Sequence, residues 1–120
     1  MVAKDALGVD FANHHRSCAV LSVKRLLACL EPEEEFTLCG DFNAPRGGEI
    51  FTALAMRYQD NIPLEYASSI DGNLHRKGPL PYMVDGLFTT PSYIASDVSL
   101  QSGVSDHCAI LATVSGSLSK

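Results

Sequence analysis

The chain has 120 residues, of which 46% are hydrophobic and 19% are charged, and its formal net charge is −5 at pH 7. This composition is that of an ordinary globular protein, and the length suggests a single domain with a packed core. Because proteins that hold long nucleic acids usually present a basic face, the acidic balance argues against a long duplex as the partner.

The four cysteines indicate the redox environment. None of them has the C-x-x-C spacing of a zinc ribbon, and each lies in an apolar stretch. We therefore expect buried free thiols and a reducing, intracellular compartment such as the cytoplasm. No apolar segment typical of a signal peptide opens the sequence, and no run of about 18 apolar residues predicts a membrane span. The cysteines are Cys18, Cys29, Cys39 and Cys108.

The first predicted element is an amphipathic helix over residues 16–30. Ala19, Val23, Leu26 and Leu30 recur at three- and four-residue steps, and Pro32 follows directly. A short buried strand is predicted over residues 36–39, because its apolar run ends at a glycine. The segment 41–48 contains proline and paired glycines and is predicted to be a loop.

The second half of the chain continues the alternation of helix and strand. A helix is predicted over residues 49–57, followed by a long irregular connection over 59–81. Strands are predicted over residues 82–88, 98–101 and 108–114, and residues 115–120 are expected to form a flexible tail. The order of elements indicates the mixed α/β (α+β) class.

Two acidic or amide side chains follow the first predicted strand, in the segment Gly40-Asp41-Phe42-Asn43. On an extended backbone, residues two apart point the same way, so Asp41 and Asn43 would converge on one site. The alternative is an Asx-turn, in which Asp41 bonds its own backbone as the chain leaves the strand. This segment alone favours the turn.

A second polar segment, Ser105-Asp106-His107, precedes the last predicted strand. A histidine can protonate or orient a phosphate oxygen near neutral pH, although a surface turn is the commoner role of such a segment. Asp85 lies inside an apolar strand, where an unpaired acid is costly. It would either hold His107 in one tautomer or lie on an exposed face of its strand.

Taken in order, the segments around Asp41, Asp85 and His107 resemble the endonuclease/exonuclease/phosphatase family, over about residues 8–114. The resemblance implies one largely antiparallel sheet with helices packed on one face, equivalent to half of the DNase I-like β-sandwich. It also implies divalent-metal-dependent hydrolysis of a phosphoester, with Mg²⁺ or Mn²⁺ as the cofactor. The substrate would be a nucleic acid, a nucleotide or a phospholipid headgroup.

The resemblance assigns a role to each motif position. Asp41 would align the attacking water and act as general base, and Asn43 would hold a phosphate oxygen. Asp106 would belong to the metal site. His107 would contact the scissile phosphate, and Asp85 would orient His107. Such roles suit phosphoryl transfer, which depends on positioning and charge stabilisation more than on covalent chemistry.

The chain also departs from the family pattern. A histidine of the first family motif is replaced by Gly8 if the motif is aligned by its distance to the first helix. An alignment that uses Asn13 and His15 keeps the residue types but leaves too few residues before that helix. His14 and His15 are then loop or helix-start residues, or one of them replaces the missing histidine.

The family domain is about twice as long as this chain, and its first half supplies a glutamate metal ligand. We therefore expect a truncated domain over residues 1–114, incomplete as an isolated chain, with one bare sheet face that a second copy or a partner chain covers. The alternative is a catalytically inactive half-domain that acts as a binding or structural module.

Overall fold

The computed structural model describes residues 23–33 and 35–116. The chain divides into two compact units, Met1–Glu33 and Glu34–Lys120. In the first unit residues 23–30 are helical, which confirms the second half of the helix predicted over 16–30, whereas residues 16–22 lie outside the described part. Among the residues described, no helix is long and apolar enough to cross a membrane.

The second unit contains one helix and five strands in the part of the chain that is described. Their bounds differ from the predicted ones by a few residues, and the two-residue strand β2 was not predicted. The elements are β1 (Thr37–Asp41), α2 (Glu49–Ala55), β2 (Gln59–Asp60), β3 (Asp85–Thr89), β4 (Tyr93–Gln101) and β5 (Ala109–Gly116). The mixed α+β class is confirmed.

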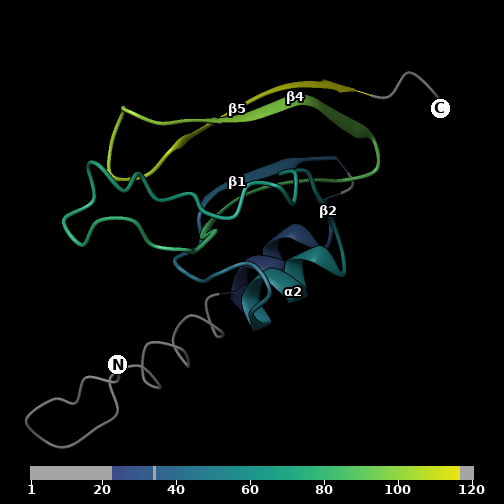
Figure 1. Cartoon of the computed structure of the whole chain (residues 1–120). Coiled ribbons are helices and arrows are strands. Elements are labelled where there is room, and N and C mark those ends of the chain that lie inside the picture. Colours follow the sequence, from purple (N-terminus) through teal and green to yellow (C-terminus); the bar gives the residue numbers. More distant parts are fainter. Residues whose placement is uncertain (1–22, 34, 117–120) are drawn as a thin grey trace, which may run out of the picture. The chain divides into compact units, whose positions relative to one another are not determined.

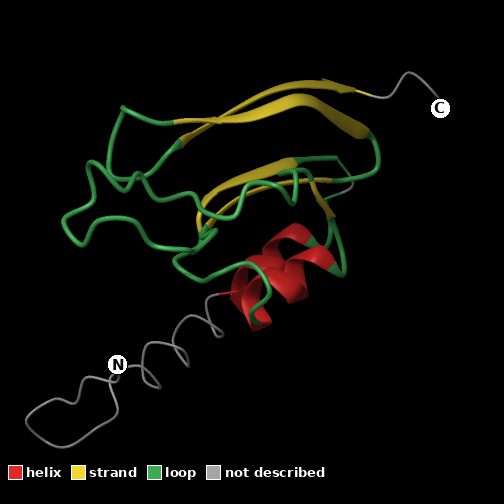
Figure 2. Cartoon of the chain, viewed as in Figure 1, coloured by secondary structure: helices red, strands yellow, loops and turns green. Residues whose placement is uncertain are grey.

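The strands form two antiparallel sheets, where one sheet was expected (Figures 1 and 2). β3 is the central strand of a three-stranded sheet with the order β1-β3-β2, and β4 pairs with β5 in a second sheet that has two strands among the described residues. Because β1 and β2 occupy both edges of β3, β4 cannot add to it after the short connection 90–92. The chain instead folds back, and Thr90 anchors this connection to Phe36 through backbone and hydroxyl hydrogen bonds.

All five residues of β3 are buried, because the strand is covered on both faces. On one face Phe88 contacts Phe42 and Phe51, which places α2 against the sheet. On the other face Leu87 belongs to a core cluster against which Val98 and Ile110 of the second sheet pack. Figure 1 accordingly shows α2 on one side of β1-β3-β2 and the β4–β5 pair on the other.

The expected bare sheet face is therefore only partly bare. β4 and β5 cover β3, but Thr37, Cys39 and Asp41, which alternate along β1, remain exposed. Exposed apolar side chains occur on the second sheet instead, at Ile94, Leu111 and Val114.

The prediction of buried thiols is wrong for two cysteines. Cys39 is exposed because it lies on the uncovered part of β1, and Cys29 is exposed on its helix. Cys108 is half-buried, and all three are free thiols. Cys18 lies outside the described residues.

Candidate functional site

The site begins where β1 ends, at Asp41. The carboxylate Oδ1 accepts a hydrogen bond of 2.7 Å from the backbone N–H of Asn43, which is the Asx-turn that the segment favoured. Asn43 has a φ of +52°, in the left-handed region that asparagine tolerates better than most residues. The turn does not exclude a site, because the second oxygen of Asp41 points to His107, at 3.8 Å from its Nε2.

Asp85 lies directly opposite Asp41 in the antiparallel register of β1 and β3. Its side chain is buried, and its Oδ2 lies 2.7 Å from His107 Nδ1. Asp85 therefore does not lie on an exposed face of its strand. The short contact fixes the tautomer and the orientation of the ring, so that Nε2 faces Asp41.

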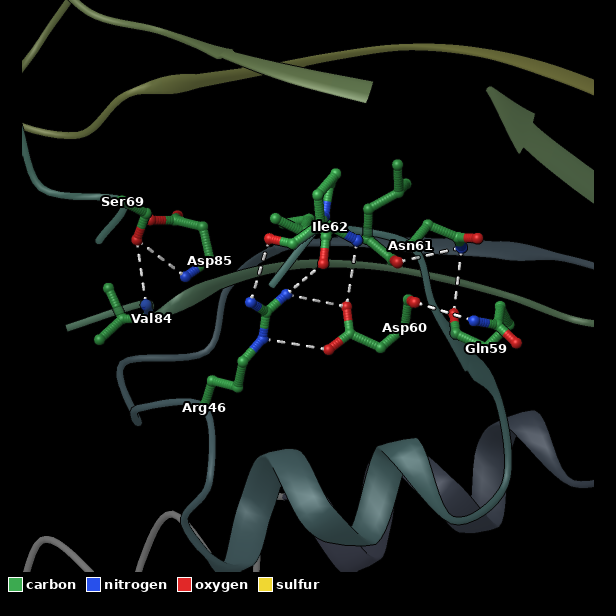
Figure 3. Close-up of polar contacts among 10 residues, drawn as sticks. Arg46, Gln59, Asp60, Asn61, Ile62, Ser69, Val84 and Asp85 are labelled. Carbon is green, nitrogen blue, oxygen red and sulfur yellow. Dashed lines mark hydrogen bonds and ion pairs between the residues drawn. The ribbon is translucent and has the colours of Figure 1, made fainter. Parts of the chain in front are cut away.

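The segment 69–71 connects the chain around Asp85 to the chain around His107. The buried hydroxyl of Ser69 accepts hydrogen bonds from the backbone N–H groups of Val84 and Asp85, at 3.0 and 3.2 Å (Figure 3). The carbonyl of Ser69 accepts from the N–H of Cys108, and the N–H of Asp71 donates to the carbonyl of Asp106. One short segment thus holds the start of β3 and the chain before β5, which carry Asp85 and His107.

Asp71 holds the loop that leads to His107. Its buried carboxylate accepts from the N–H groups of Asn73 and Leu74 and, across the structure, from that of Gly103 at 2.7 Å. These bonds, led by the one from Gly103, lower the pKa of the Asp71 carboxyl. Neither Ser69 nor Asp71 could be recognised as part of the site from the sequence, because the segment 59–81 has no periodicity. Asp71-Gly72-Asn73 indicated a turn and nothing more.

Three predicted residues thus come together at the ends of β1 and β3. Asp41, Asp85 and His107 each offer one ligand atom, and these atoms lie within 4.8 Å of one another. The residues are widely separated in the sequence, and one of the two carboxylates is buried while the other is exposed. Two carboxylates and an imidazole at this distance form a group that can hold a cation or a proton between them.

The charges around His107 favour its protonated form. The hydrogen bond to Asp85 is the largest cause of a raised His107 pKa. Burial opposes it, and the negative charges of Asp85, Asp41 and Asp106 add to it. Burial, and after it the negative charges of Asp71 and Asp85, raise the pKa of the Cys108 thiol, which makes this cysteine a poor nucleophile.

Two other predicted residues lie near this group but are not members of it. The side chain of Asp106 is exposed and acts on His107 through its charge. Asn43 is also exposed, two residues beyond Asp41. The structure therefore brings Asp41, Asp85 and His107 together, while the metal role of Asp106 and the phosphate role of Asn43 stay predictions. Gly8, Asn13, His14 and His15 lie outside the described residues.

Arg46 fixes the loop that follows Asn43. Its guanidinium makes two hydrogen bonds of 3.2 Å to the carboxylate of Asp60 and one of 2.7 Å to the carbonyl of Ile62 (Figure 3). Its backbone N–H donates to the carbonyl of Met83, and that of Phe42 donates to Val84. The loop 42–46 thus continues the antiparallel contact beyond the last pair of β1 and β3 and holds Asp41 in place.

No family model, curated protein or solved structure matches this chain.

Proposed function

We propose that this chain is a divalent-metal-dependent phosphoester hydrolase of the endonuclease/exonuclease/phosphatase type. The observation that carries the proposal is the grouping of Asp41, Asp85 and His107, with the 2.7 Å contact between Asp85 and His107 Nδ1. If these motifs occurred by chance, Asp85 would not be expected to contact His107, which lies 22 residues later in the chain. Their contact supports a shared role in catalysis.

The chain's own residues can supply three parts of a hydrolysis. His107 is held by Asp85, which raises its pKa, and it can present Nε2–H to a phosphate oxygen. Asp41 is exposed, and its Oδ2, which does not bond Asn43, can accept a proton from an attacking water. Asn43 has an exposed side chain at the same strand end, where its amide can donate to a second phosphate oxygen.

The donor set fits a divalent cation. The carboxylates of Asp41 and Asp85 suit Mg²⁺ or Mn²⁺, and an imidazole such as His107 suits Zn²⁺ better. Because Asp85 and His107 Nδ1 already bond each other, Asp41 is the principal candidate ligand within the group, with Asp106 as the further ligand that the resemblance implies. Such an ion would stabilise charge on the phosphoryl group and lower the pKa of a water.

A second candidate function is that of a catalytically inactive half-domain, a binding or structural module that pairs with a second copy or a partner chain. The exposed apolar side chains of Ile94, Leu111 and Val114 favour it. Among the described residues β5 pairs with β4 alone, and this also favours it, since the strand has no proline or charge to discourage further pairing.

The first test is the substitution Asp41→Asn, assayed with bis(p-nitrophenyl) phosphate in the presence of Mg²⁺ or Mn²⁺. We expect at least a roughly 100-fold fall in kcat, because the general base is lost, with little change in the melting temperature measured without the metal ion. The control is Asp97→Asn, at an exposed position of β4 with a φ of +53°, where asparagine fits as well as aspartate.

A wild-type rate in Asp41→Asn would show that the site is assigned wrongly. If the wild-type chain shows no turnover with either ion and sediments as a dimer, the binding module becomes the better description.

A further inference from the structure

A pocket of about 500 Å³ is lined by residues that follow Asp41 and precede Asp85 in the chain. Its lining includes the loop 45–48 and Leu64, Tyr66, Tyr82 and Met83. The volume lies in the range of small-molecule sites, and the lining is mostly apolar and aromatic, as such sites usually are.

The pocket has one cationic side chain, Arg46, and that charge is already compensated. Asp60 forms a two-pronged ion pair with its guanidinium, and the carbonyls of Ile62 and Pro63 accept further hydrogen bonds. A phosphate would have to displace these bonds to reach Arg46. The pocket therefore suits an uncharged group and not the phosphate itself.

The wall of the pocket is continuous with the strands that carry the acidic residues. Met83 lies two residues before Asp85, and its carbonyl accepts a hydrogen bond of 2.7 Å from the N–H of Arg46. Because Phe42 likewise bonds the chain at Val84, the pocket wall begins where the strand pair that carries Asp41 and Asp85 ends.

Two tyrosines offer ring surface in this pocket. Tyr66 packs against the buried cluster of Ile62, Met83 and Leu87, so it is a fixed wall. Tyr82 is 49% exposed, and its ring has area that no other part of the described chain covers. Gly47, at a φ of +91°, also lines the pocket and adds no side chain to it.

We propose that this pocket binds the planar aromatic ring of the substrate, a nucleobase or a ring of similar shape, by stacking on Tyr82 while the phosphate lies at Asp41 and His107. The inference rests on the proposed function for the position of the phosphate. Stacking on an aromatic side chain is favourable for every base, so the pocket selects for a ring and not for one sequence.

The test is equilibrium dialysis with radiolabelled adenosine, which carries the ring without the phosphate. Adenosine should bind the wild-type chain, and Tyr82→Ala should weaken its binding about tenfold, the lower part of the range found for base stacking. Tyr82→Phe keeps the ring and should restore binding. Tyr93→Ala is the matched control outside the pocket, and melting curves of all variants check that they fold.

Hydrolysis assays on two substrates test the pocket separately from the proposed hydrolase activity. For the 5′-(p-nitrophenyl) ester of adenylate, Tyr82→Ala should raise KM about tenfold and affect kcat much less. For methyl p-nitrophenyl phosphate, whose only ring leaves with the nitrophenol, the rise in KM should be smaller. Asp41→Asn should lose turnover and keep adenosine binding.

Each arm has an outcome that decides it. If adenosine binds and no phosphoester is hydrolysed, the pocket is upheld and the proposed function fails. If phosphodiesters are hydrolysed but adenosine does not bind, or binds Tyr82→Ala as well as the wild type, the inference about the pocket is overturned. If Tyr82→Ala raises KM for methyl p-nitrophenyl phosphate and leaves KM for the adenylate ester unchanged, the pocket binds a simple aryl group and not a nucleobase, and the inference is overturned.

Discussion

At the scale of single residues, the pair of Asp85 and His107 makes the stability of the fold depend on pH. Its hydrogen bond raises the pKa of His107 above the ordinary value of 6.5, against the effect of burial. A group whose pKa is raised on folding adds stability that is fully present below its unfolded pKa. That stability is lost as the pH rises through the folded pKa. The pair should therefore stabilise the fold most below pH 6.5 and contribute less as the pH rises above it.

Asp85→Asn removes the cause of this shift. We expect the His107 pKa to fall, because an amide cannot stabilise the imidazolium as a carboxylate does. NMR titration of the histidine Hε1 resonances measures it, with His107→Gln to assign the signal. The wild-type free energy of unfolding should decline as the pH rises above the ordinary value of 6.5, and Asp85→Asn should flatten this decline. An unchanged His107 titration would contradict the ionic nature of the pair.

At the scale of elements, β3 must pass closely between two layers, and Gly86 permits it. A Cβ at this position would lie 2.6 Å from Cε2 of Phe42 and 2.9 Å from Cε2 of Phe88. The aromatic cluster that joins α2 to the sheet therefore depends on the absence of a side chain next to Asp85.

Gly86→Ala should destabilise the fold by about 1–3 kcal/mol, since the rings must move out of a close-packed arrangement. Urea denaturation measures the loss. Gly116→Ala is the matched control in another strand, where the added Cβ would make an ordinary contact of 3.8 Å with Tyr93. Equal stability of the two variants would mean that the rings adjust without cost.

Ser69 is the second feature at this scale, because it connects an irregular segment to two strands. Ser69→Ala leaves the N–H groups of Val84 and Asp85 without their acceptor in a buried place, which should cost about 1–3 kcal/mol. It should also lower kcat, since Asp85 is no longer held. Ser102→Ala, in an exposed turn, is the control. A variant that keeps stability but loses activity would mean that Ser69 only positions Asp85.

At the scale of the whole molecule, three acidic residues, Asp41, Asp85 and Asp106, act on one histidine, and this excess of negative charge attracts cations to the ends of β1 and β3. A cation that binds only the folded chain stabilises it, by about 2.7 kcal/mol at a concentration 100 times its Kd. We expect Mn²⁺ or Mg²⁺ to raise the melting temperature of the wild type and of Asp97→Asn, and not that of Asp41→Asn. A rise that persists in Asp41→Asn would place the ion elsewhere.

The sequence by itself determined the features that depend on local chemistry. Apolar periodicity identified the helix of residues 49–57, which forms over Glu49–Ala55, and the pattern Asp-x-Asn indicated the Asx-turn that forms at Asp41. The cost of an unpaired acid in an apolar strand made the pairing of Asp85 with His107 one of two predicted arrangements, and this is the one that forms.

The tertiary structure decided how the strands divide into sheets, because that division depends on which edges of β3 are occupied. β1 and β2 take both edges of β3, so the strands after it form a second sheet, which covers part of the sheet face that was expected to be bare. The pairing of Asp41 with Asp85 and the bonds of Ser69 and Asp71 follow from contacts between segments far apart in the chain, where no periodicity exists to reveal them. Those contacts also leave the side chain of Asp106 outside the group that Asp41, Asp85 and His107 form.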